Sequence, residues 1–363
     1  YSVGHSGNSA WIERWDPFPP GAMDWILLLA ESPGGPDELR SVMFAPDGNL
    51  VVAGKQRRTD IGHGDDVWVA KYDPTGGLVW SVNYNSPANS DDLAYAVTVD
   101  LSGSIYVAGA ETRTDLGQGR NILVLKYSAS GALLWTRSYT SPGIANDEGR
   151  AIAVDGTGNL YVGGYETRND LGQGENGWVR KCSPAGTPLW TATFNSPMTR
   201  FGGPNDRALG IAVDPVNGDV FATGRVERPG QAANVLFARW DASGTLLDLQ
   251  TRNGPNNGND EGRAITVGPG DDLYVAGFEN WDNLAQKENV TTYQWPRPGC
   301  LKAALSVSPV PVWSGLPIEV VLTVTNTGAN AVTSVTPVLT IAPGAGLLSL
   351  LTAPSPLARR GPG

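Results

Sequence analysis

The sequence predicts an all-β chain built from repeated units of four short antiparallel strands, and three observations support this. The 363 residues include 46 Gly and 27 Pro, which favour turns, with 12 Trp and 11 Tyr, which favour strands. Short apolar segments that end in glycine recur along the chain. No stretch shows a helical period of apolar residues. Together these features indicate many short strands joined by tight turns.

Four markers keep the same phase along the chain and define the repeat. An apolar segment ends in a glycine at Gly54, Gly109, Gly164, Gly224 and Gly277. A second marker is a tryptophan every 55 residues, at Trp25, Trp80, Trp135 and Trp190. A third set of large or apolar residues comprises Trp15, Tyr72, Tyr127, Cys182, Trp240 and Trp295. An aspartate comes just before the first strand of each unit, at Asp37, Asp92, Asp147, Asp206 and Asp260.

Each unit is expected to fold as one blade of a β-propeller. In the copy that begins near Gly143, the expected strands are 150–155, 160–165, 177–182 and 189–194, and Gly-containing turns join them. Four antiparallel strands at such a period are typical of propeller blades. Five full units follow strands two to four of a sixth, which favours six blades and leaves five or seven open. We expect the propeller to span residues 1–304. Its strand-two glycines are expected to allow close packing between blades, and its strand-four tryptophans to fill the wedge between them.

The repeat resembles a known family. The segment from Asp147 to Phe194 is similar to the SBBP-type β-propeller repeats of secreted bacterial and archaeal proteins. The resemblance covers roughly residues 1–305. It implies the propeller fold and a location outside the cell, and it implies no shared chemistry.

Residues 305–363 are expected to form a separate module. Alternating β-branched residues lead to Val324–Gly328, a strand ending in Asn-Thr-Gly, which resembles the immunoglobulin-like modules of CARDB type on surface proteins. Further strands are expected at 332–341 and 347–352. A complete sandwich of this class has about seven strands in roughly 100 residues, so this module is expected to be incomplete. A strand donated by a neighbouring copy would complete it.

Composition narrows the function. The net charge of −10 disfavours nucleic acid as a partner, because phosphate backbones are repelled. No apolar run approaches the roughly 18 residues of a membrane span. The chain begins at Tyr1 and is expected to be processed or truncated. Cys182 and Cys300 are expected to be free or buried thiols, although a disulfide between them stays open. His5 and His63 are not spaced as metal ligands.

The repeated aspartates Asp37, Asp92, Asp147, Asp206 and Asp260 are the sharpest polar feature, and two interpretations are open. They could form a ring of carboxylates that holds a hard cation such as Ca²⁺. Alternatively, each could bond backbone N–H groups where the inner strand begins and so tie the blades together. Presence in every full unit favours the structural interpretation, and no cofactor is expected. The glycine-rich loop 114–119, with copies at Asp60 and Asp170, is expected to be a structural turn.

Three functions are compatible with these features. The first is an extracellular structural or adhesive surface protein, with copies joined head-to-tail into a filament by strand exchange. The second is a carbohydrate-binding or carbohydrate-active propeller with a site at the channel mouth, carried by residues that break the repeat: Met198–Phe201, Arg225–Arg228 and Trp281. The third is a fragment of a larger surface protein. The lack of a catalytic motif favours the first, and the chain is expected not to be an enzyme.

Overall fold

The chain is all-β, as predicted. The computed structural model describes residues 1–6, 9–16, 22–29, 35–196, 205–228, 230–254, 257–268, 273–281, 286–295, 301–306, 318–326 and 338–341. The chain divides into two compact units, Tyr1–Thr292 and Tyr293–Gly363. The helices in the described residues are three-residue 3-10 turns, and none is able to cross a membrane.

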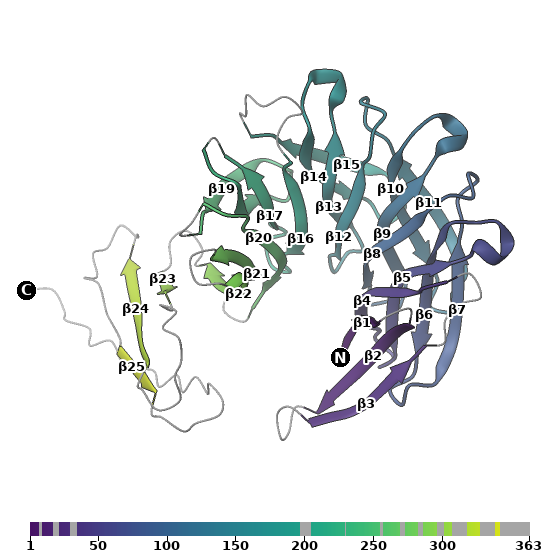
Figure 1. The fold of residues 1–363 in the computed structure, drawn as a ribbon, viewed down its shortest axis with the longest axis horizontal. Coiled ribbons are helices and arrows are strands. Elements are labelled where there is room, and N and C mark those ends of the chain that lie inside the picture. The colour runs from purple at the N-terminus through teal and green to yellow at the C-terminus, as the bar shows by residue number, and fades with distance from the viewer. Residues whose placement is uncertain are drawn as a thin grey trace, which may run out of the picture. The chain divides into compact units, whose positions relative to one another are not determined.

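Within its described residues, unit 1 contains six antiparallel sheets that follow one another along the chain, here called blades 1 to 6 (Figure 1). Blade 1 consists of β1 (Ser2–Ser6), β2 (Ser9–Asp16) and β3 (Ala22–Leu28). Blade 2 consists of β4 (Glu38–Phe44), β5 (Leu50–Arg57), β6 (Asp65–Tyr72) and β7 (Leu78–Tyr84). Blade 3 consists of β8 (Asp92–Val99), β9 (Ile105–Thr112), β10 (Arg120–Tyr127) and β11 (Leu133–Tyr139).

The later blades repeat this order. Blade 4 consists of β12 (Glu148–Val154), β13 (Leu160–Thr167), β14 (Glu175–Cys182) and β15 (Pro188–Phe194). Blade 5 consists of β16 (Arg207–Val213), β17 (Val220–Glu227), β18 (Ala233–Trp240) and β19 (Leu246–Arg252). Blade 6 consists of β20 (Glu261–Val267), β21 (Leu273–Trp281) and β22 (Gln286–Trp295).

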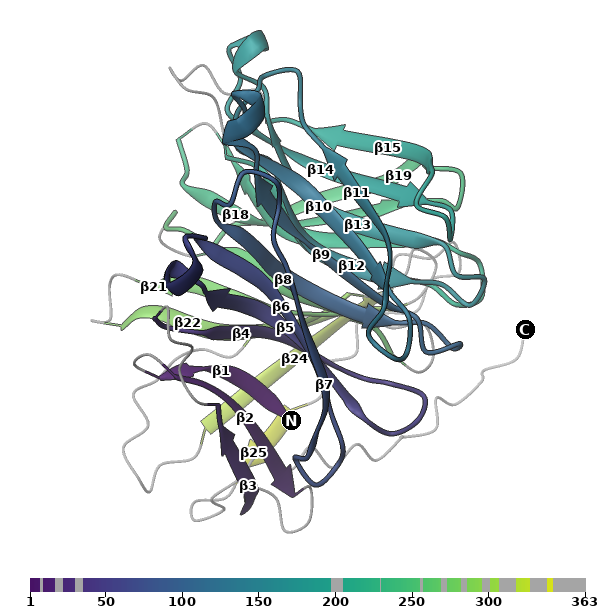
Figure 2. The ribbon, with the colours of Figure 1, turned by 90° about the vertical axis from the view of Figure 1, so that its right-hand side faces the viewer.

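The first strand of each sheet is the innermost. Between consecutive blades, β4 packs against β8, β8 against β12, β12 against β16 and β16 against β20. Figure 1 shows these strands on the inside of the curve, with β7, β11, β15 and β19 on the outside, and Figure 2 shows the blades from the side. The innermost strands of blades 2 to 6 therefore line the inner side of this curve, which is called the channel side below.

Blade 1 begins at the second strand position. Its β1 and β2 pack against β4 in the way that the second and third strands of other blades pack against the innermost strand of the next blade. The six sheets match the favoured count of six blades. The sequence predicts a fourth strand for blade 6. In the described residues, the next segment, β23 (Leu301–Ser306), pairs instead with β24 (Ile318–Asn326). The division between the units accordingly lies before the predicted one at residue 304.

The strand-two glycine was expected to allow close packing between blades. It instead allows close approach of the first and second strands within its own blade. Each innermost strand of blades 2 to 6 carries a β-bulge, and in blade 4 the register shifts between Gly149 and Ala151. A Cβ on Gly164 would overlap the carbonyl oxygen of Glu148 beside this bulge. Equivalent overlaps arise at Gly54, Gly109, Gly224 and Gly277. Glycine is needed because the bulged strand brings its backbone against the next strand.

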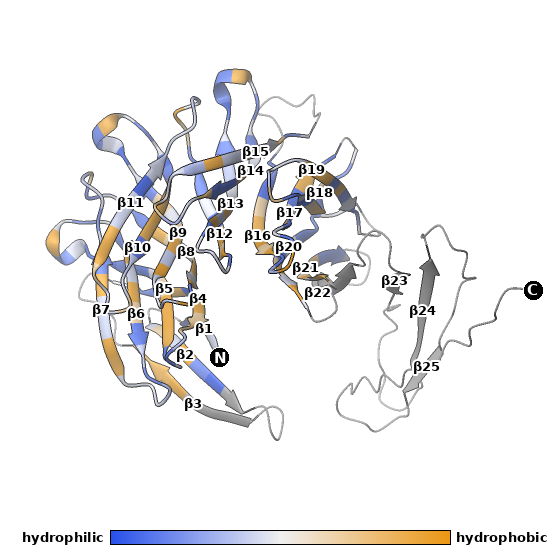
Figure 3. Cartoon of the chain, turned by 180° about the vertical axis from the view of Figure 1, so that it is seen from behind, coloured by the Kyte–Doolittle hydropathy of each residue, from blue (hydrophilic) through white to orange (hydrophobic). Residues whose placement is uncertain are grey.

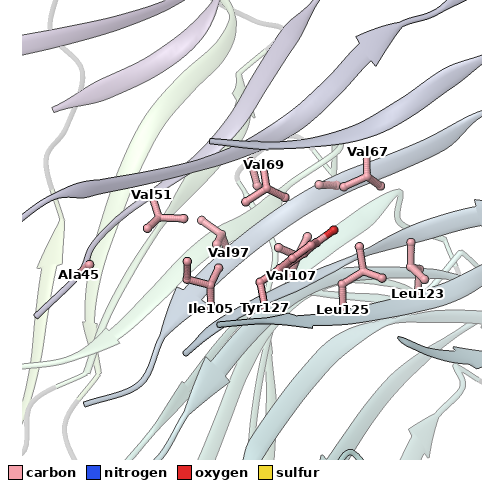
Figure 4. Close-up of a cluster of buried hydrophobic side chains, with 12 residues drawn as sticks. Ala45, Val51, Val67, Val69, Val97, Ile105, Val107, Leu123, Leu125 and Tyr127 are labelled. Carbon is pink, nitrogen blue, oxygen red and sulfur yellow. The ribbon is translucent and has the colours of Figure 1, made fainter. Parts of the chain in front are cut away.

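Hydrophobic residues fill the spaces between blades. Figure 3 shows them recurring along the strands of unit 1. Figure 4 shows the cluster between blades 2 and 3, where Val67 and Val69 from β6 lie across from Leu123, Leu125 and Tyr127 of β10. Such dry, close-packed contacts supply most of the stability of a fold whose blades are only four strands wide.

The strand-four tryptophans join neighbouring blades, as expected. The indole N–H of Trp80 in blade 2 donates to the carbonyl of Ala129 in blade 3, at 3.2 Å. Trp190 donates in the same way to Ala242 of blade 5, also at 3.2 Å. A Cβ at Gly131 would press on the Trp80 ring, so the glycine of each receiving turn makes room for the indole of the previous blade.

Unit 2 contains an antiparallel sheet of β23, β24 and β25 (Val338–Ile341) in its described residues. The predicted strand ending at Val324–Gly328 coincides with the end of β24, and the segment 332–341 contains β25. The strand predicted at 347–352 lies outside the described residues. The resemblance to a CARDB-type module stays a prediction.

We expect Gly164→Ala to lower the free energy of unfolding by about 1–3 kcal/mol, because its Cβ has no space beside the bulge. Gly156 of the same blade is the matched control, since a Cβ there meets nothing within 4 Å. Gly156→Ala should change the free energy by less than about 0.5 kcal/mol. Urea unfolding of the two variants measures both. Equal stability would show that the bulge does not need glycine.

Candidate functional site

The five repeated aspartates are buried and bonded to backbone N–H groups. In blade 4, one carboxylate oxygen of Asp147 accepts from the N–H of Ser141 at 2.5 Å, and the other accepts from the N–H of Thr167 at 2.7 Å. The same pattern links Asp92 to Ser86 and Thr112, Asp206 to Ser196 and Glu227, and Asp260 to Gly254 and Asn280. Asp37 accepts from the N–H of Arg57 at 3.1 Å.

These bonds connect one blade to the next. Ser141 follows the last strand of blade 3, whereas Thr167 ends the second strand of blade 4. The N–H of Asp147 also donates to the carbonyl of Arg120 in blade 3, at 2.8 Å. Among the described residues, no group of three or more His, Cys, Asp or Glu side chains is arranged to hold a metal ion. The geometry gives these aspartates a role in the fold.

Burial raises the pKa of two of these carboxyl groups well above the ordinary range. The pKa of Asp92 is raised to about 7 and that of Asp147 to about 6, because desolvation outweighs the N–H groups that favour the charged form. The pKa values of Asp206 and Asp260 are also raised by burial. The folded state therefore binds protons more tightly at these sites than the unfolded chain.

The bulges place an additional side chain on each innermost strand. The bulged residue stands three positions after the repeated aspartate, and the five are Arg40, Tyr95, Arg150, Leu209 and Arg263. None of these side chains is fully buried. The bulge positions thus differ from blade to blade, whereas the aspartate before them does not.

Three of the bulged side chains stack on one another across blades 2, 3 and 4. The Arg40 guanidinium lies 4.7 Å from the centre of the Tyr95 ring, and the Arg150 guanidinium lies 3.9 Å from it. Both distances are within the range of a cation–π contact. Because the three residues come from β4, β8 and β12, the stack joins three innermost strands at the channel.

Carboxylates pair with the arginines of this stack. Arg40 makes two hydrogen bonds of 2.9 Å to Glu38. Glu148 pairs with Arg120 at 2.8 Å and with Arg150 at 2.5 Å. Burial alone would raise the pKa of the Glu148 carboxyl, but the two guanidinium groups outweigh it and lower the pKa. Glu148 is therefore charged at neutral pH and forms ion pairs with both arginines.

Some arginine N–H groups lack a hydrogen-bond acceptor within the part of the chain that the structure describes. They are Nη1 of Arg40, Nε of Arg150 and Nε of Arg225. Arg225, at blade 5, pairs with Glu227 at 3.2 Å and lies 3.8 Å from Glu261 of blade 6. These three arginines therefore have buried N–H groups with unused donor capacity.

The predicted channel-mouth residues lie in other blades than this stack. Arg225 lies on β17 of blade 5, where it contacts Glu227 and Glu261, and Arg228 lies just beyond the end of β17. Trp281 ends β21, and nothing is described of its side chain; Met198–Phe201 lies outside the described residues. Sequence reasoning missed Arg40, Tyr95, Arg150 and Arg263. The sequence does contain a signal for them. Each lies three residues after a repeated aspartate, at a position whose residue type differs between units although the aspartate is the same in all of them.

The remaining sequence candidates lie apart from this site. The loop 114–119 contains a 3-10 turn, Thr114–Leu116, closed by Gly117 in the left-handed conformation, and Arg113 pairs with Asp115 at 2.8 Å. His63 contacts Asp66 at 3.3 Å, and His5 lies on β1. Cys182 is a buried free thiol. Cys300 lies outside the described residues, so the possible disulfide stays untested.

Comparison with known proteins finds weak likenesses, and no protein-family model matches the chain. A regulatory protein, FlaEY of Caulobacter vibrioides, is 30% identical over 145 residues, which are 37% of this chain and 14% of that protein. The chain thus matches about a seventh of its length. An α-L-arabinofuranosidase of Fusarium graminearum is 10% identical, with a TM-score of 0.46 over 84% of this chain and 92% of that one. A gluconolactonase of Xanthomonas campestris is 12% identical, with a TM-score of 0.40 over 75% and 76%.

The prediction that the chain is not an enzyme needs correction. It rested on the absence of a catalytic motif in a propeller repeat, yet the structures similar to this chain include the arabinofuranosidase and the gluconolactonase. At these identities and TM-scores, the likeness assigns no activity to this chain.

We expect Asp147→Ala to destabilise unit 1 by about 2–5 kcal/mol, since it leaves two buried N–H groups, those of Ser141 and Thr167, without an acceptor. Asp115→Ala is the matched control, because that exposed carboxylate pairs only with Arg113 at the surface and should cost less than about 1 kcal/mol. Chemical denaturation measures both. A cost for Asp147→Ala no larger than that of its control would argue against the structural role.

The raised pKa values of Asp92 and Asp147 also predict a pH dependence. Between the unfolded pKa of about 3.9 and the folded values, the native state holds more protons. These two groups should therefore make the free energy of unfolding fall as pH rises from about 4 to about 7. Asp147→Asn, which cannot ionise, should reduce this slope when guanidinium unfolding is followed at several pH values. An unchanged slope in the variant would contradict the assignment.

Proposed function

We propose that the propeller binds an acidic carbohydrate at its central channel, through the arginines on the bulges of the innermost strands. The observation that carries the proposal is the stack of Arg40, Tyr95 and Arg150 across three consecutive blades. An arrangement that joins side chains from several blades at the channel is the kind of place where propellers can gather ligand-binding groups without a local sequence motif.

Stacking leaves the edges of the guanidinium groups available. A guanidinium that lies flat on an aromatic ring keeps its N–H groups in the plane, pointing away from the ring. The Arg40 and Arg150 side chains are 22% and 28% exposed, so a ligand can reach them. Their fixed planes suit the oxygen atoms of a sugar, because several donors converge without losing much side-chain entropy on binding.

The donor and acceptor balance favours an acidic sugar. Sugar hydroxyls both donate and accept, and the channel offers both kinds of group, arginine donors and the carboxylates of Glu38 and Glu148. Three donors, on Arg40, Arg150 and Arg225, lack a hydrogen-bond acceptor in the described residues, against one acceptor, Oε2 of Glu148, that lacks a donor. A sugar carboxylate, as in a uronate, would accept hydrogen bonds from two donors of one guanidinium.

The other predicted functions remain predictions. Self-assembly by strand exchange depends on the C-terminal module, most of which lies outside the described residues. The location outside the cell, expected from the sequence resemblance, would bring the channel into contact with polysaccharides. The carbohydrate proposal does not depend on either.

Calorimetry with an oligogalacturonate and a neutral arabino-oligosaccharide tests the proposal. We expect the acidic ligand to bind more tightly, and Arg150→Gln to weaken it by about tenfold or more. Glu148 keeps Arg120 as its partner in this variant, so the fold should survive. Arg113→Gln, at the distant loop, is the control and should bind like the wild type. Equal binding of both sugars, or of the wild type and Arg150→Gln, would overturn the proposal.

A further inference from the structure

A cavity of about 180 Å³ lies between blades 3 and 4, where the repeat is broken. Its walls include Trp135, Arg137 and Tyr139 of β11 and Trp178, Arg180 and Cys182 of β14. It is separate from the central channel, since β11 is the outermost strand of its blade. Three of these positions carry residues that the equivalent positions in other blades do not.

Cys182 creates the space. Strand register aligns Cys182 with Tyr72, Tyr127 and Trp240, all of which are buried between blades. Between blades 2 and 3, Tyr127 and its neighbour Leu125 belong to the buried hydrophobic cluster (Figure 4). A cysteine is much smaller than a tyrosine or tryptophan, so the contact between blades 3 and 4 keeps a void where the others are packed.

Two arginines line this void at positions that are apolar in most other blades, although Gln250 is the counterpart of Arg137 in blade 5. Register aligns Arg180 with the buried Ala70, Leu125 and Ala238. It aligns Arg137 with Val82 and Ala192, which pack into the hydrophobic clusters of their own interfaces. Two cations therefore enter one interface in place of hydrocarbon, and both line the same cavity.

Neither arginine is matched by a carboxylate among the described residues. Arg180 donates to the hydroxyl of Thr191 at 2.8 Å, and Arg137 donates to the carbonyls of Thr136 and Ala185. Burial lowers the pKa of Arg180 and outweighs the opposing effect of the nearby Glu166 carboxylate. Two like charges beside an apolar cavity favour the binding of an anion.

The aromatic side chains that line the cavity favour an anion that carries an aromatic ring. Tyr139 and Trp178 stack with their ring centres 5.4 Å apart, and the Arg180 guanidinium lies over both rings, at 4.3 and 4.6 Å. Trp178 is 1% exposed, and its indole N–H has no acceptor in the described residues. This buried donor is a third group that an acceptor atom in the cavity would satisfy.

We propose that this cavity binds a small aromatic carboxylate, with the ring against Trp135, Tyr139 and Trp178 and the carboxylate on Arg180 and Arg137. An apolar cavity of about 150 Å³ in another protein is large enough for benzene, so benzoate or phenylacetate matches the size. Cys182 supplies room rather than chemistry, because burial raises the pKa of its thiol and keeps it protonated.

Titration of benzoate and phenylacetate against the full chain, followed by tryptophan fluorescence and calorimetry, tests this site. Both acids should bind. Benzyl alcohol, which has no carboxylate, and inorganic phosphate, which has no aromatic ring, should bind at least about tenfold more weakly. Binding of benzyl alcohol as tight as that of benzoate would overturn the assignment of an anion site. Failure of both acids to bind the wild type would overturn the site itself.

Variants that introduce the residues found at the equivalent positions of other blades test where the ligand binds. Cys182→Tyr fills the cavity with the residue found in blades 2 and 3 and should abolish binding, while Cys182→Ser, which keeps the space, should preserve it. Arg180→Leu introduces the residue found at this position in blade 3. It should lower the affinity for the two acids by about ten- to a hundredfold without lowering the affinity for benzyl alcohol. Because Arg180→Leu replaces a half-buried charge with the residue of blade 3, it tests the site even if Cys182→Tyr fails to fold. Wild-type affinity in folded Cys182→Tyr or in Arg180→Leu would contradict the proposal, and neither result bears on sugar binding at the channel.

Discussion

The bond between a buried carboxylate and the N–H groups around it fixes how each blade begins. Asp147 holds the loop that leaves blade 3, through Ser141, and the end of the second strand of blade 4, through Thr167. The innermost strand starts at the next residue and bulges after Gly149. The bulge requires Gly164 on the second strand and presents Arg150 at the channel. One polar contact thus sets the spacing of the blades and the position of the variable residue.

Residues that recur in every blade serve the fold, and residues that depart from the repeat supply chemistry. The aspartates and the strand-two glycines of blades 2 to 6 meet equivalent backbone groups, and Trp80 and Trp190 donate to equivalent carbonyls of the next blade. The bulge positions carry Arg, Tyr or Leu, and in blades 2 to 4 three of them stack on one another. Between blades 3 and 4, Arg180 and Cys182 replace packed hydrocarbon and leave a charged cavity. A symmetric scaffold binds asymmetric ligands only where its symmetry is broken.

The sequence predicts the fold well because turns and apolar strands repeat in phase, so each blade supports the same interpretation. The sequence also suggests two roles for Asp147, binding a cation or bonding backbone N–H groups. The two roles can be distinguished only in the structure, where the N–H groups of Ser141 and Thr167 donate to its carboxylate. Three features could not be predicted. The role of Gly164 depends on a bulge that apolar alternation does not encode. The stack on Tyr95 joins residues about 55 positions apart. The cavity depends on residue volume across a blade contact, so Cys182 in the marker series looked like a simple variant.

A crystal structure of the protein with a bound oligogalacturonate is the most direct test of this division between fold and function. We predict a sugar carboxylate within hydrogen-bond distance of the Arg40 or Arg150 guanidinium, with Asp147 still accepting from Ser141 and Thr167. Sugar bound only at the outer loops, or a cation held by the Asp147 carboxylate in place of its N–H partners, would contradict it.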